Sequence, residues 1–473
     1  MLLAARRIEQ RRTLGACAAY LGIALISAAQ QRPPGPKGVP LLGAALAFGR
    51  DPLRFLTECA RRHGDLVAFR IGAWPALLVN DPKDIEYVLV KNHRGFTKNR
   101  HFWRYVRAIF GTGLLTARGD DWQRQRRLNA PAFSGQRLAG YGAVMVRHAQ
   151  TTLKGWQPGE RLDVHAEIMA LTLEIAAETL FGTSVKRDVA AIEQSTNVLM
   201  AEISARLRRP FFIPDGIPIP GNVRYRRALR RIDQLVARIV AERRQSGEDR
   251  GDLLSLLLLA RYENGEPMSE RQIRDEVVTM LLAGHETTAL ALSWSCYLLS
   301  RHPTIEARLA AEAHEVLGTR APTLDDLPRL RVCEQVINEA MRLYPPAWAI
   351  GREVIDPCEI GGYRVPAGVT IFISPWVMHR DSRYFDSPNE FRPDRWASGL
   401  AKQLPRFAYM PFGGGPRVCI GNRFAMMEAV LILAMIAQHF VLEAQNERPE
   451  PFPSITLRPK GGVWLRPQAR LLS

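Results

Sequence analysis

Residues 411–421 read PFGGGPRVCIG, and this stretch decides how the rest of the chain is interpreted. Its three consecutive glycines allow the backbone to approach a neighbour closely. Residues 422–439 have helical periodicity, which places Cys419 just before the start of a helix. Backbone N–H groups and the positive end of the helix dipole favour a thiolate there. Because a thiolate is a strong, soft ligand for iron, the stretch predicts an iron ligand at Cys419.

Two other interpretations of this stretch have weaker support. A phosphate-binding loop would follow a clear strand and continue into Lys-Ser or Lys-Thr, and neither feature is present. A buried structural cysteine would not require the glycines. The chain has six cysteines in 473 residues, with no CxxC pair and no zinc-type spacing. We therefore expect a reducing compartment rather than a disulfide framework.

The longest predicted helix runs from Ser269 to about Arg301. Ser269 and Gln272 form a capping box at its start, and Pro303 closes its far end. About 33 residues would span about 50 Å, enough to cross a whole domain. Its centre, residues 280–288, reads MLLAGHETT. A glycine inside a helix costs about 1 kcal/mol relative to alanine, and hydroxyls tend to bend helices. Such a break indicates a functional site, the alternative being a kink made for packing.

The pattern Phe412-x-x-Gly415-x-Arg417-x-Cys419-x-Gly421 resembles the haem-binding signature of the cytochrome P450 superfamily. The resemblance implies that haem b is the cofactor and that the Cys419 thiolate is its iron ligand. It also implies that Phe412 packs against the thiolate face of the haem and that Arg417 binds a haem propionate.

The centre of the long helix resembles the oxygen-activation motif of the same family. The resemblance implies that Ala283 and Gly284 face the haem and leave room for O₂. It further implies that Thr287 hydrogen-bonds to the oxygen and that Glu286 relays protons. This division suits the reaction, because cleavage of the O–O bond needs protons that arrive without flooding the site with water.

Two further sets of residues follow from the resemblance. Glu339-x-x-Arg342 resembles the helix motif of the family, and Arg395 would complete a charge-assisted triad that locks the core beside the haem. The alternative is a set of ordinary surface ion pairs. Arginine forks suit the haem propionates. The residues that the resemblance places around the cofactor, besides those of the cysteine loop, are Trp122, Arg126 and Arg352.

Helical periodicity dominates the rest of the chain, so the expected fold is mainly α with small antiparallel β-sheets. We expect a single large domain over residues 32–473, with the haem between the long central helix and the cysteine loop. The predicted helices are Asp51–His63, Asp81–Asn92, Gln136–Trp156, Asp163–Phe181, Asp188–Arg208 and Tyr225–Gln245. The predicted strands are Leu66–Ile71, Ala76–Val79, Glu359–Val365 and Thr370–Ile373.

Residues 1–31 stand apart from this domain. Four arginines precede a mildly apolar run, Leu14–Ala29, and a proline-rich stretch follows it. At 1.5 Å per residue the run would span about 24 Å, less than the roughly 30 Å of a bilayer core. A weak membrane anchor, a signal peptide and an amphipathic or disordered leader all stay open. We expect a cytoplasmic protein that contacts a membrane, if at all, through these residues.

The formal net charge is +17, from 64 Lys and Arg against 47 Asp and Glu. No basic run with interleaved aromatics indicates a nucleic-acid groove, so we expect no nucleic-acid partner. The chain shows no dinucleotide fingerprint and no ferredoxin cysteine set, so electrons would come from a separate protein. An acidic ferredoxin or flavodoxin, served by its reductase, would suit the excess charge. A compositional preference for arginine is the alternative. The basic residues expected to dock this partner are Arg124, Arg127, Arg406 and Arg417.

The resemblance implies a monomeric monooxygenase that inserts one oxygen atom from O₂ into a lipophilic substrate. Fatty acids, terpenoids, steroids and polyketide-like compounds all stay open. A peroxygenase or a non-oxygenating member of the family would tend to lose the pair Glu286 and Thr287, which is present here. A haem-thiolate sensor would carry a partner or DNA-binding module, and the sequence shows none.

Overall fold

The computed structural model describes residues 32–208, 213–262, 265–445 and 448–470, so the predictions for residues 1–31 lie outside the described residues. The chain forms two compact units. The first comprises residues up to His101, Ala349–Pro388 and Leu404–Val418. The second comprises Phe102–Trp348, Asn389–Gln403 and Cys419 onward.

The first unit is built around a mixed five-stranded sheet in the order β1-β2-β8-β5-β3. Strands β2 and β8 are parallel and the other neighbours are antiparallel. Leu77, Val79, Ile371 and Ile373 lie in its apolar core. The strands of this unit are β1 (Leu66–Ile71), β2 (Trp74–Val79), β3 (Phe96–Thr97), β5 (Ile350–Val354), β6 (Cys358–Ile360), β7 (Tyr363–Val365) and β8 (Thr370–Ile373). Its helices are α2 (Ala45–Arg50), α3 (Pro52–His63), α4 (Pro82–Glu86) and α15 (Pro375–Met378), and α5 (Arg100–Phe110) begins in it.

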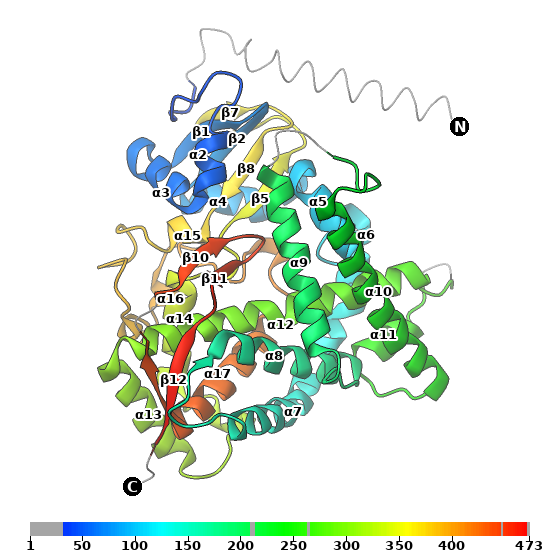
Figure 1. Cartoon of the computed structure of the whole chain (residues 1–473). Coiled ribbons are helices and arrows are strands. Elements are labelled where there is room, and N and C mark those ends of the chain that lie inside the picture. The colour runs from blue at the N-terminus through cyan, green and yellow to red at the C-terminus, as the bar shows by residue number, and fades with distance from the viewer. Residues whose placement is uncertain (1–31, 209–212, 263–264, 446–447, 471–473) are drawn as a thin grey trace. The chain divides into compact units, whose positions relative to one another are not determined.

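The second unit is helical, and α12 (Glu270–Ser300) runs through it with α8 (Val164–Phe181) and α17 (Asn422–His439) packed against it (Figure 1). The other helices are α6 (Gly119–Asn129), α7 (Gly135–Lys154), α9 (Val189–Arg208), α10 (Pro220–Ser246), α11 (Leu253–Leu259), α13 (Pro303–Leu317), α14 (Arg331–Leu343) and α16 (Leu400–Gln403). A three-stranded sheet and a two-stranded hairpin complete the unit. The strands are β4 (Leu162–Asp163), β9 (Phe440–Ala444), β10 (Glu450–Pro453), β11 (Leu457–Lys460) and β12 (Trp464–Ala469).

The mainly helical fold and most of the element boundaries agree with expectation, and the differences have local causes. The predicted strand over residues 359–365 is a hairpin, because Gly361 and Gly362 both take positive φ and turn the chain between β6 and β7. The helix predicted over residues 81–92 gives way to a π-helical turn at Tyr87–Lys91. The sheets are not all antiparallel, since β2 pairs with β8 in parallel.

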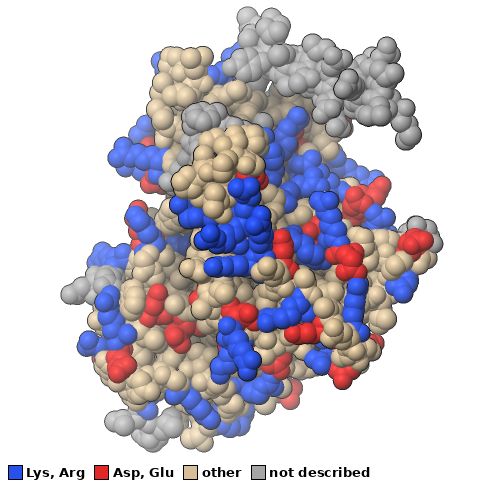
Figure 2. Space-filling model, turned by 45° about the vertical axis from the view of Figure 1, so that its right-hand side comes forward, with Lys and Arg blue, Asp and Glu red and all other residues tan. Residues whose placement is uncertain are grey.

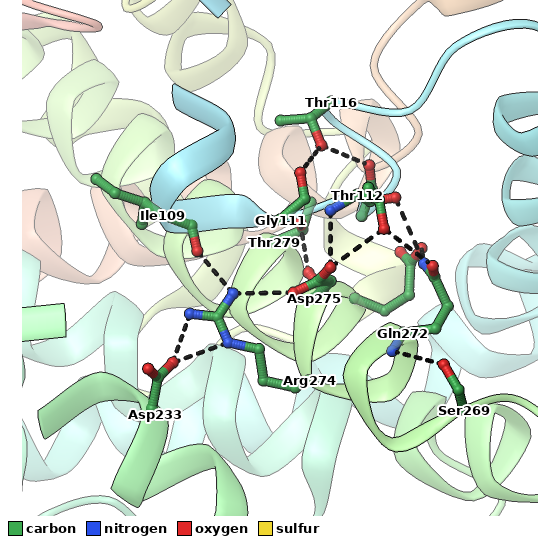
Figure 3. A network of polar contacts seen from close by, with 12 residues as sticks. Ile109, Gly111, Thr112, Thr116, Asp233, Ser269, Gln272, Arg274, Asp275 and Thr279 are labelled. Carbon is green, nitrogen blue, oxygen red and sulfur yellow. Dashed lines mark hydrogen bonds and ion pairs between the residues drawn. The ribbon is translucent and has the colours of Figure 1, made fainter. Parts of the chain in front are cut away.

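The first half of α12 is fixed by polar contacts with the segment between α5 and α6 (Figure 3). The carboxylate of Asp275 accepts hydrogen bonds from the backbone N–H of Thr112 at 2.7 Å and from its hydroxyl at 3.2 Å. Arg274 donates to Asp275 at 2.9 Å, to the carbonyl of Ile109 at 2.7 Å and to Asp233 at 2.8 Å. Gly111 is required here, because a Cβ would lie 2.0 Å from the Asp275 carboxyl group.

The start of α12 differs in one detail from expectation. The Ser269 hydroxyl accepts the N–H of Gln272 at 3.2 Å, as a cap should. The Gln272 side chain, however, donates to Glu276 at 2.9 Å instead of returning to the cap. Ser269 therefore caps the helix without a reciprocal capping box. Among the described residues, no helix has both the length and the apolar character that crossing a membrane requires.

Candidate active site

The centre of α12 has one accessible strip. Between Met280 and Leu290 every residue is buried except Ala283, Gly284 and Thr287, which are half-buried. The Thr287 hydroxyl donates to the carbonyl oxygen of Ala283, one helical turn away, at 3.0 Å. Its proton is therefore engaged, while the oxygen lone pairs of Thr287 can accept a hydrogen bond from a ligand.

Gly284 lies beside α8. A Cβ at this position would lie 3.8 Å from Leu180 and 4.0 Å from Ala176, both on α8. The missing side chain of Gly284 thus points at α8. Both distances are ordinary van der Waals contacts, and the expected place of Gly284 beside the haem stays a prediction.

Glu286 is buried and held as an anion. One carboxylate oxygen, Oε1, accepts hydrogen bonds from Arg458 Nε at 2.7 Å and from the Thr456 hydroxyl. Burial alone would raise the pKa of Glu286, but the charge and hydrogen bond of Arg458, helped by Thr456, outweigh burial and keep this pKa below its ordinary value. The acid beside Thr287 is therefore ionised at neutral pH.

Cys419 lies three residues before α17, and Gly421 occupies the N-cap position of that helix. Among the described cysteines, Cys59, Cys296 and Cys333 are buried, whereas Cys419 is exposed. Although the side chain is accessible, surrounding protein atoms desolvate the thiol and raise its pKa, while the Gly421 N–H and the charge of Arg126 lower it. The helix start acts in the expected direction, but desolvation outweighs it, so the thiolate would form fully only on a metal.

Trp122 and Arg126 lie one turn apart on α6 and are both half-buried. Arg126 is close enough to Cys419 for the two charges to interact. Burial lowers the pKa of Arg126, and a Cys419 thiolate would raise it. The structure thus brings these residues of α6 to the same region as the cysteine that precedes α17.

Glu339, Arg342 and Arg395 meet in the interior of the second unit. Arg342 forms a two-pronged contact with the Glu339 carboxylate, with both distances 2.8 Å, and Arg395 Nε donates to the same carboxylate at 3.0 Å. The side chains of Glu339 and Arg342 are completely buried, and that of Arg395 is nearly so. The indole of Trp396 and the backbone N–H of Arg392 each donate a further hydrogen bond to Glu339 at 2.9 Å. These contacts tie α14 to the segment after residue 389 and are not surface ion pairs.

Comparison with known proteins identifies the family. The sequence model of the family described as Cytochrome P450 matches residues 33–468. The chain belongs to the cytochrome P450 family. Cyclooctatin synthase from Streptomyces melanosporofaciens is 41% identical over 90% of this chain and 91% of its own length. Cyclooctat-9-en-7-ol 5-monooxygenase from the same organism is 40% identical, over 89% and 90%. Pentalenene oxygenase from Streptomyces avermitilis is 38% identical, over 85% and 90%.

Cytochromes P450 bind haem b through a cysteine thiolate, and this chain is accordingly a haem-dependent monooxygenase. The first unit contributes Arg352, Phe412 and Arg417 to the residues expected at the cofactor. Arg352 lies on β5, where burial lowers the pKa of its guanidinium to about 10. Its Nη1 donates to the carbonyl of Gly351 at 3.0 Å. No carboxylate among the described residues forms an ion pair with Arg352, so its surroundings suit an anionic group from a ligand.

The glycines of the cysteine loop serve the packing of the first unit. Gly415 has φ +68°, and a Cβ there would lie 1.9 Å from the carbonyl oxygen of Leu89. A Cβ at Gly414 would lie 2.0 Å from the ring of Phe407. Phe412, ahead of these glycines, is half-buried. The glycine-rich loop therefore approaches other residues of the first unit, Leu89 and Phe407, as closely as the sequence indicated.

The residues present fit a haem. An accessible cysteine is available as the metal ligand, and arginines with lowered pKa values, Arg126 and Arg352, match the chemistry of two propionates. Thr456 and Arg458, the partners of Glu286, were not singled out from the sequence. No local pattern in the sequence could have revealed their contact with a helix about 170 residues earlier in the chain.

Proposed function

We propose that this cytochrome P450 hydroxylates a lipophilic terpenoid, using O₂ and electrons from a separate redox protein. The overall reaction converts R–H, O₂, two electrons and two protons into R–OH and water. The observation that carries the proposal is the pairing, on one helix, of an accessible hydroxyl at Thr287 with an ionised buried acid at Glu286. An enzyme that receives protons from its own residues needs such a pair.

Bound haem would supply the activation of O₂. Cys419 would be its iron ligand, and the N–H of Gly421 would hydrogen-bond to the sulfur. Trp122, Arg126, Arg352 and Arg417 would hold the propionates, and Phe412 would cover the cysteine side. These residues fix and orient the cofactor.

The residues of α12 would handle protons. Ala283 would leave space beside the accessible strip, and the Thr287 oxygen would accept or pass a hydrogen bond there. Glu286 would take up a proton on its carboxylate and release it toward Thr287. Because both residues lie in a largely buried helix, protons would arrive without bulk water.

A terpenoid substrate is supported by the relatives. The names of two of them state that they act on cyclooctat-9-en-7-ol and pentalenene. Large aromatic side chains, which suit a lipophilic substrate, lie on α5 and in the segment after α14. Phe102 and Trp103 pack edge to face at 5.5 Å. The indole of Trp348 donates to the carbonyl of Ser454 at 2.9 Å.

Two spectroscopic measurements and a turnover assay test this proposal. The ferrous–CO spectrum of the loaded enzyme should have the thiolate-ligated form. A panel of cyclic terpenes, fatty acids and steroids should produce its largest substrate-induced spectral shifts with terpenes. Product should then appear with reductant and redox partner. Turnover with peroxide but never with reductant would contradict the proposal.

An acidic ferredoxin or flavodoxin, with its reductase, is the proposed electron donor. Figure 2 shows Lys and Arg side chains spread over the visible face, with Asp and Glu among them. Arg406 is 64% exposed although it contacts Glu86 at 2.9 Å, and Arg124 pairs with Asp121. Such surface pairs are weak and leave the cations available to a partner.

Salt provides the test of this electrostatic docking. Partner-driven turnover should fall steeply with added salt, whereas peroxide-driven turnover should not. Arg406→Gln should weaken partner-driven turnover more than Arg230→Gln, a matched change on α10. Equal salt sensitivity of both reactions would contradict the docking.

We further propose that the protein acts as a cytoplasmic monomer. Cell fractionation of the full chain and of a chain lacking residues 1–31 would test whether these residues cause membrane contact. Size-exclusion chromatography with light scattering would test the oligomeric state. A dimer at working concentration would contradict the proposed monomeric state.

A further inference from the structure

The two hydrogen bonds to Glu286 both end on the same oxygen. Arg458 Nε donates to Oε1 at 2.7 Å, and the Thr456 hydroxyl donates to Oε1 as well. Among the described residues, no donor contacts Oε2. One oxygen of the carboxylate is thus fixed by two donors from the C-terminal hairpin, and the other is left for a mobile proton.

Arg458 is itself held from a second direction. Its Nη1 donates to Asn197 Oδ1 on α9 at 2.7 Å. The side chain of Glu286 is 4% exposed and that of Arg458 is 14% exposed, while Asn197 is exposed. The three side chains therefore form a continuous polar connection from a buried acid on α12 to the surface of α9.

An arginine suits this position for two reasons. Its planar fork can hold two acceptors in fixed directions at once, which a lysine ammonium cannot do in the same way. A buried carboxylate also needs a compensating charge, because removing one partner of a buried ion pair leaves the other uncompensated.

The other titratable groups around Glu286 do not replace Arg458 as the cation. His285 is adjacent on α12, and burial lowers its pKa, as does the charge of Arg458. His165 on α8 has its pKa lowered by burial to about 4, although the charges of Asp163 and Glu286 oppose this effect. Both histidines are therefore neutral at pH 7, and Arg458 provides the positive charge.

We propose that Arg458 is the positioning residue of Glu286: it fixes Oε1, leaves Oε2 to take up and release the proton, and links the acid to α9 through Asn197. This inference rests on the proton role proposed above for Glu286. Loss of Arg458 should therefore impair proton delivery as much as loss of Glu286 does. The positive charge at residue 458 should be the property of this side chain with the largest effect.

The experiment uses the full-length, haem-loaded enzyme and the variants Arg458→Gln, Arg458→Lys, Glu286→Gln and the double variant Arg458→Gln/Glu286→Gln. Lys460→Gln is the matched control, since Lys460 lies on the same strand but forms an exposed pair with Glu450. The first readout is infrared difference spectroscopy across pH 5–8, a range chosen about neutrality, which detects protonated carboxyl groups without turnover. The second is the ratio of hydrogen peroxide released to O₂ consumed with reductant and redox partner.

Arg458→Gln should show a new protonated-carboxyl band at neutral pH that disappears in the double variant. Its peroxide ratio should rise by about tenfold, as in Glu286→Gln, because proton delivery is lost. The double variant should be no worse than Glu286→Gln alone, which is the signature of residues that act through one another. Arg458→Lys keeps the cation but not the fork, so it should lack the new carboxyl band and should raise the peroxide ratio less than Arg458→Gln does. Lys460→Gln should retain all of the wild-type behaviour.

Three negative outcomes are distinguishable. If Glu286→Gln raises the peroxide ratio but Arg458→Gln gives neither the band nor the rise, the positioning role is wrong and the proton role of Glu286 stands. If Glu286→Gln leaves the peroxide ratio unchanged, the proton role itself is wrong. A drop in thermal stability of Arg458→Gln without the new band would mean a merely structural arginine and would also overturn the inference.

Discussion

Glu276 and Glu286 lie on the same helix, and both are buried, yet their charge states differ. Glu276 is completely buried and accepts hydrogen bonds from the N–H of Leu114 and the amide of Asn129, both at 3.2 Å, and from Gln272 at 2.9 Å. Desolvation nevertheless raises the pKa of Glu276 to about 7, because these neutral donors compensate only part of its burial. The pKa of Glu286, beside Arg458, moves in the opposite direction.

The comparison shows what decides the state of a buried acid. Neutral dipoles reduce the cost of burying a carboxylate, but a fixed cation at 2.7 Å reverses the sign of the pKa shift. One helix thus carries an acid that titrates near neutrality at its fixed end and an acid that stays ionised at its functional centre. The nearby cation Arg274 is paired with Asp275, and the negative charge of Asp275 raises the pKa of Glu276 further.

The largest expected effect is on turnover. Glu286→Gln should lower the rate of product formation by about 100-fold, because the proton donor is lost. Glu276→Gln, which changes an acid outside the accessible strip, should change that rate by less than about threefold. Steady-state product formation with reductant and redox partner measures both. Equal losses of rate in the two variants would show that Glu286 has no role in turnover that Glu276 lacks.

The next effect is on stability. Arg458→Gln should reduce the free energy of unfolding by about 3–5 kcal/mol at pH 8, since it leaves a buried carboxylate without its cation. In the wild type the folded-state pKa of Glu286 is lowered, so its contribution is present above the unfolded-state pKa and disappears as pH falls through the folded-state value. Chemical unfolding at pH 8 and at pH 4 should therefore show a smaller difference between variant and wild type at pH 4. A difference that does not depend on pH would contradict an ionised Glu286.

Glu276 should give the opposite pH dependence. Its folded-state pKa of about 7 lies above the unfolded value, so the folded state binds an extra proton between these values and stability falls as pH rises through that window. The loss should amount to about 3 kcal/mol. Glu276→Gln should abolish this part of the slope and be relatively more stable at pH 8. An unchanged slope in chemical unfolding would show that Glu276 does not titrate there.

The smallest effect concerns the hydroxyl that shares Oε1 with Arg458. Thr456→Val should cost about 1–2 kcal/mol of stability, the value of a hydrogen bond to a charged group, because it keeps the side-chain volume. Thr456→Ser, which retains the hydroxyl, is the matched control. A loss in Thr456→Val larger than that in Arg458→Gln would mean that the hydroxyl, and not the cation, stabilises Glu286.

Sequence reasoning succeeded where the signal is local. Ala283 and Thr287 are one helical turn apart, as are Trp122 and Arg126, so the helix alone places them together. The cap residue Ser269 and the helix-ending Pro303 likewise located α12 to within one residue at each end.

Features that depend on distant parts of the chain could not be predicted in this way. Arg458 reaches Glu286 from a strand 172 residues further along the chain, and nothing local distinguishes it from the many other arginines. The residues that lie next to Gly284 depend on how α8 packs against α12. The parallel pairing of β2 with β8 likewise joins strands that are far apart in sequence.

Turnover with isotopically labelled O₂ tests the central claim most directly. The terpene that gives the largest spectral shift would be incubated with reductant, redox partner and labelled O₂, using wild type and Glu286→Gln. Each product molecule of the wild type should contain one labelled oxygen atom. The variant should form about 100-fold less product while O₂ consumption continues. Product without the label would contradict oxygen insertion from O₂, and labelled product formed equally fast by both proteins would contradict the proton role of Glu286.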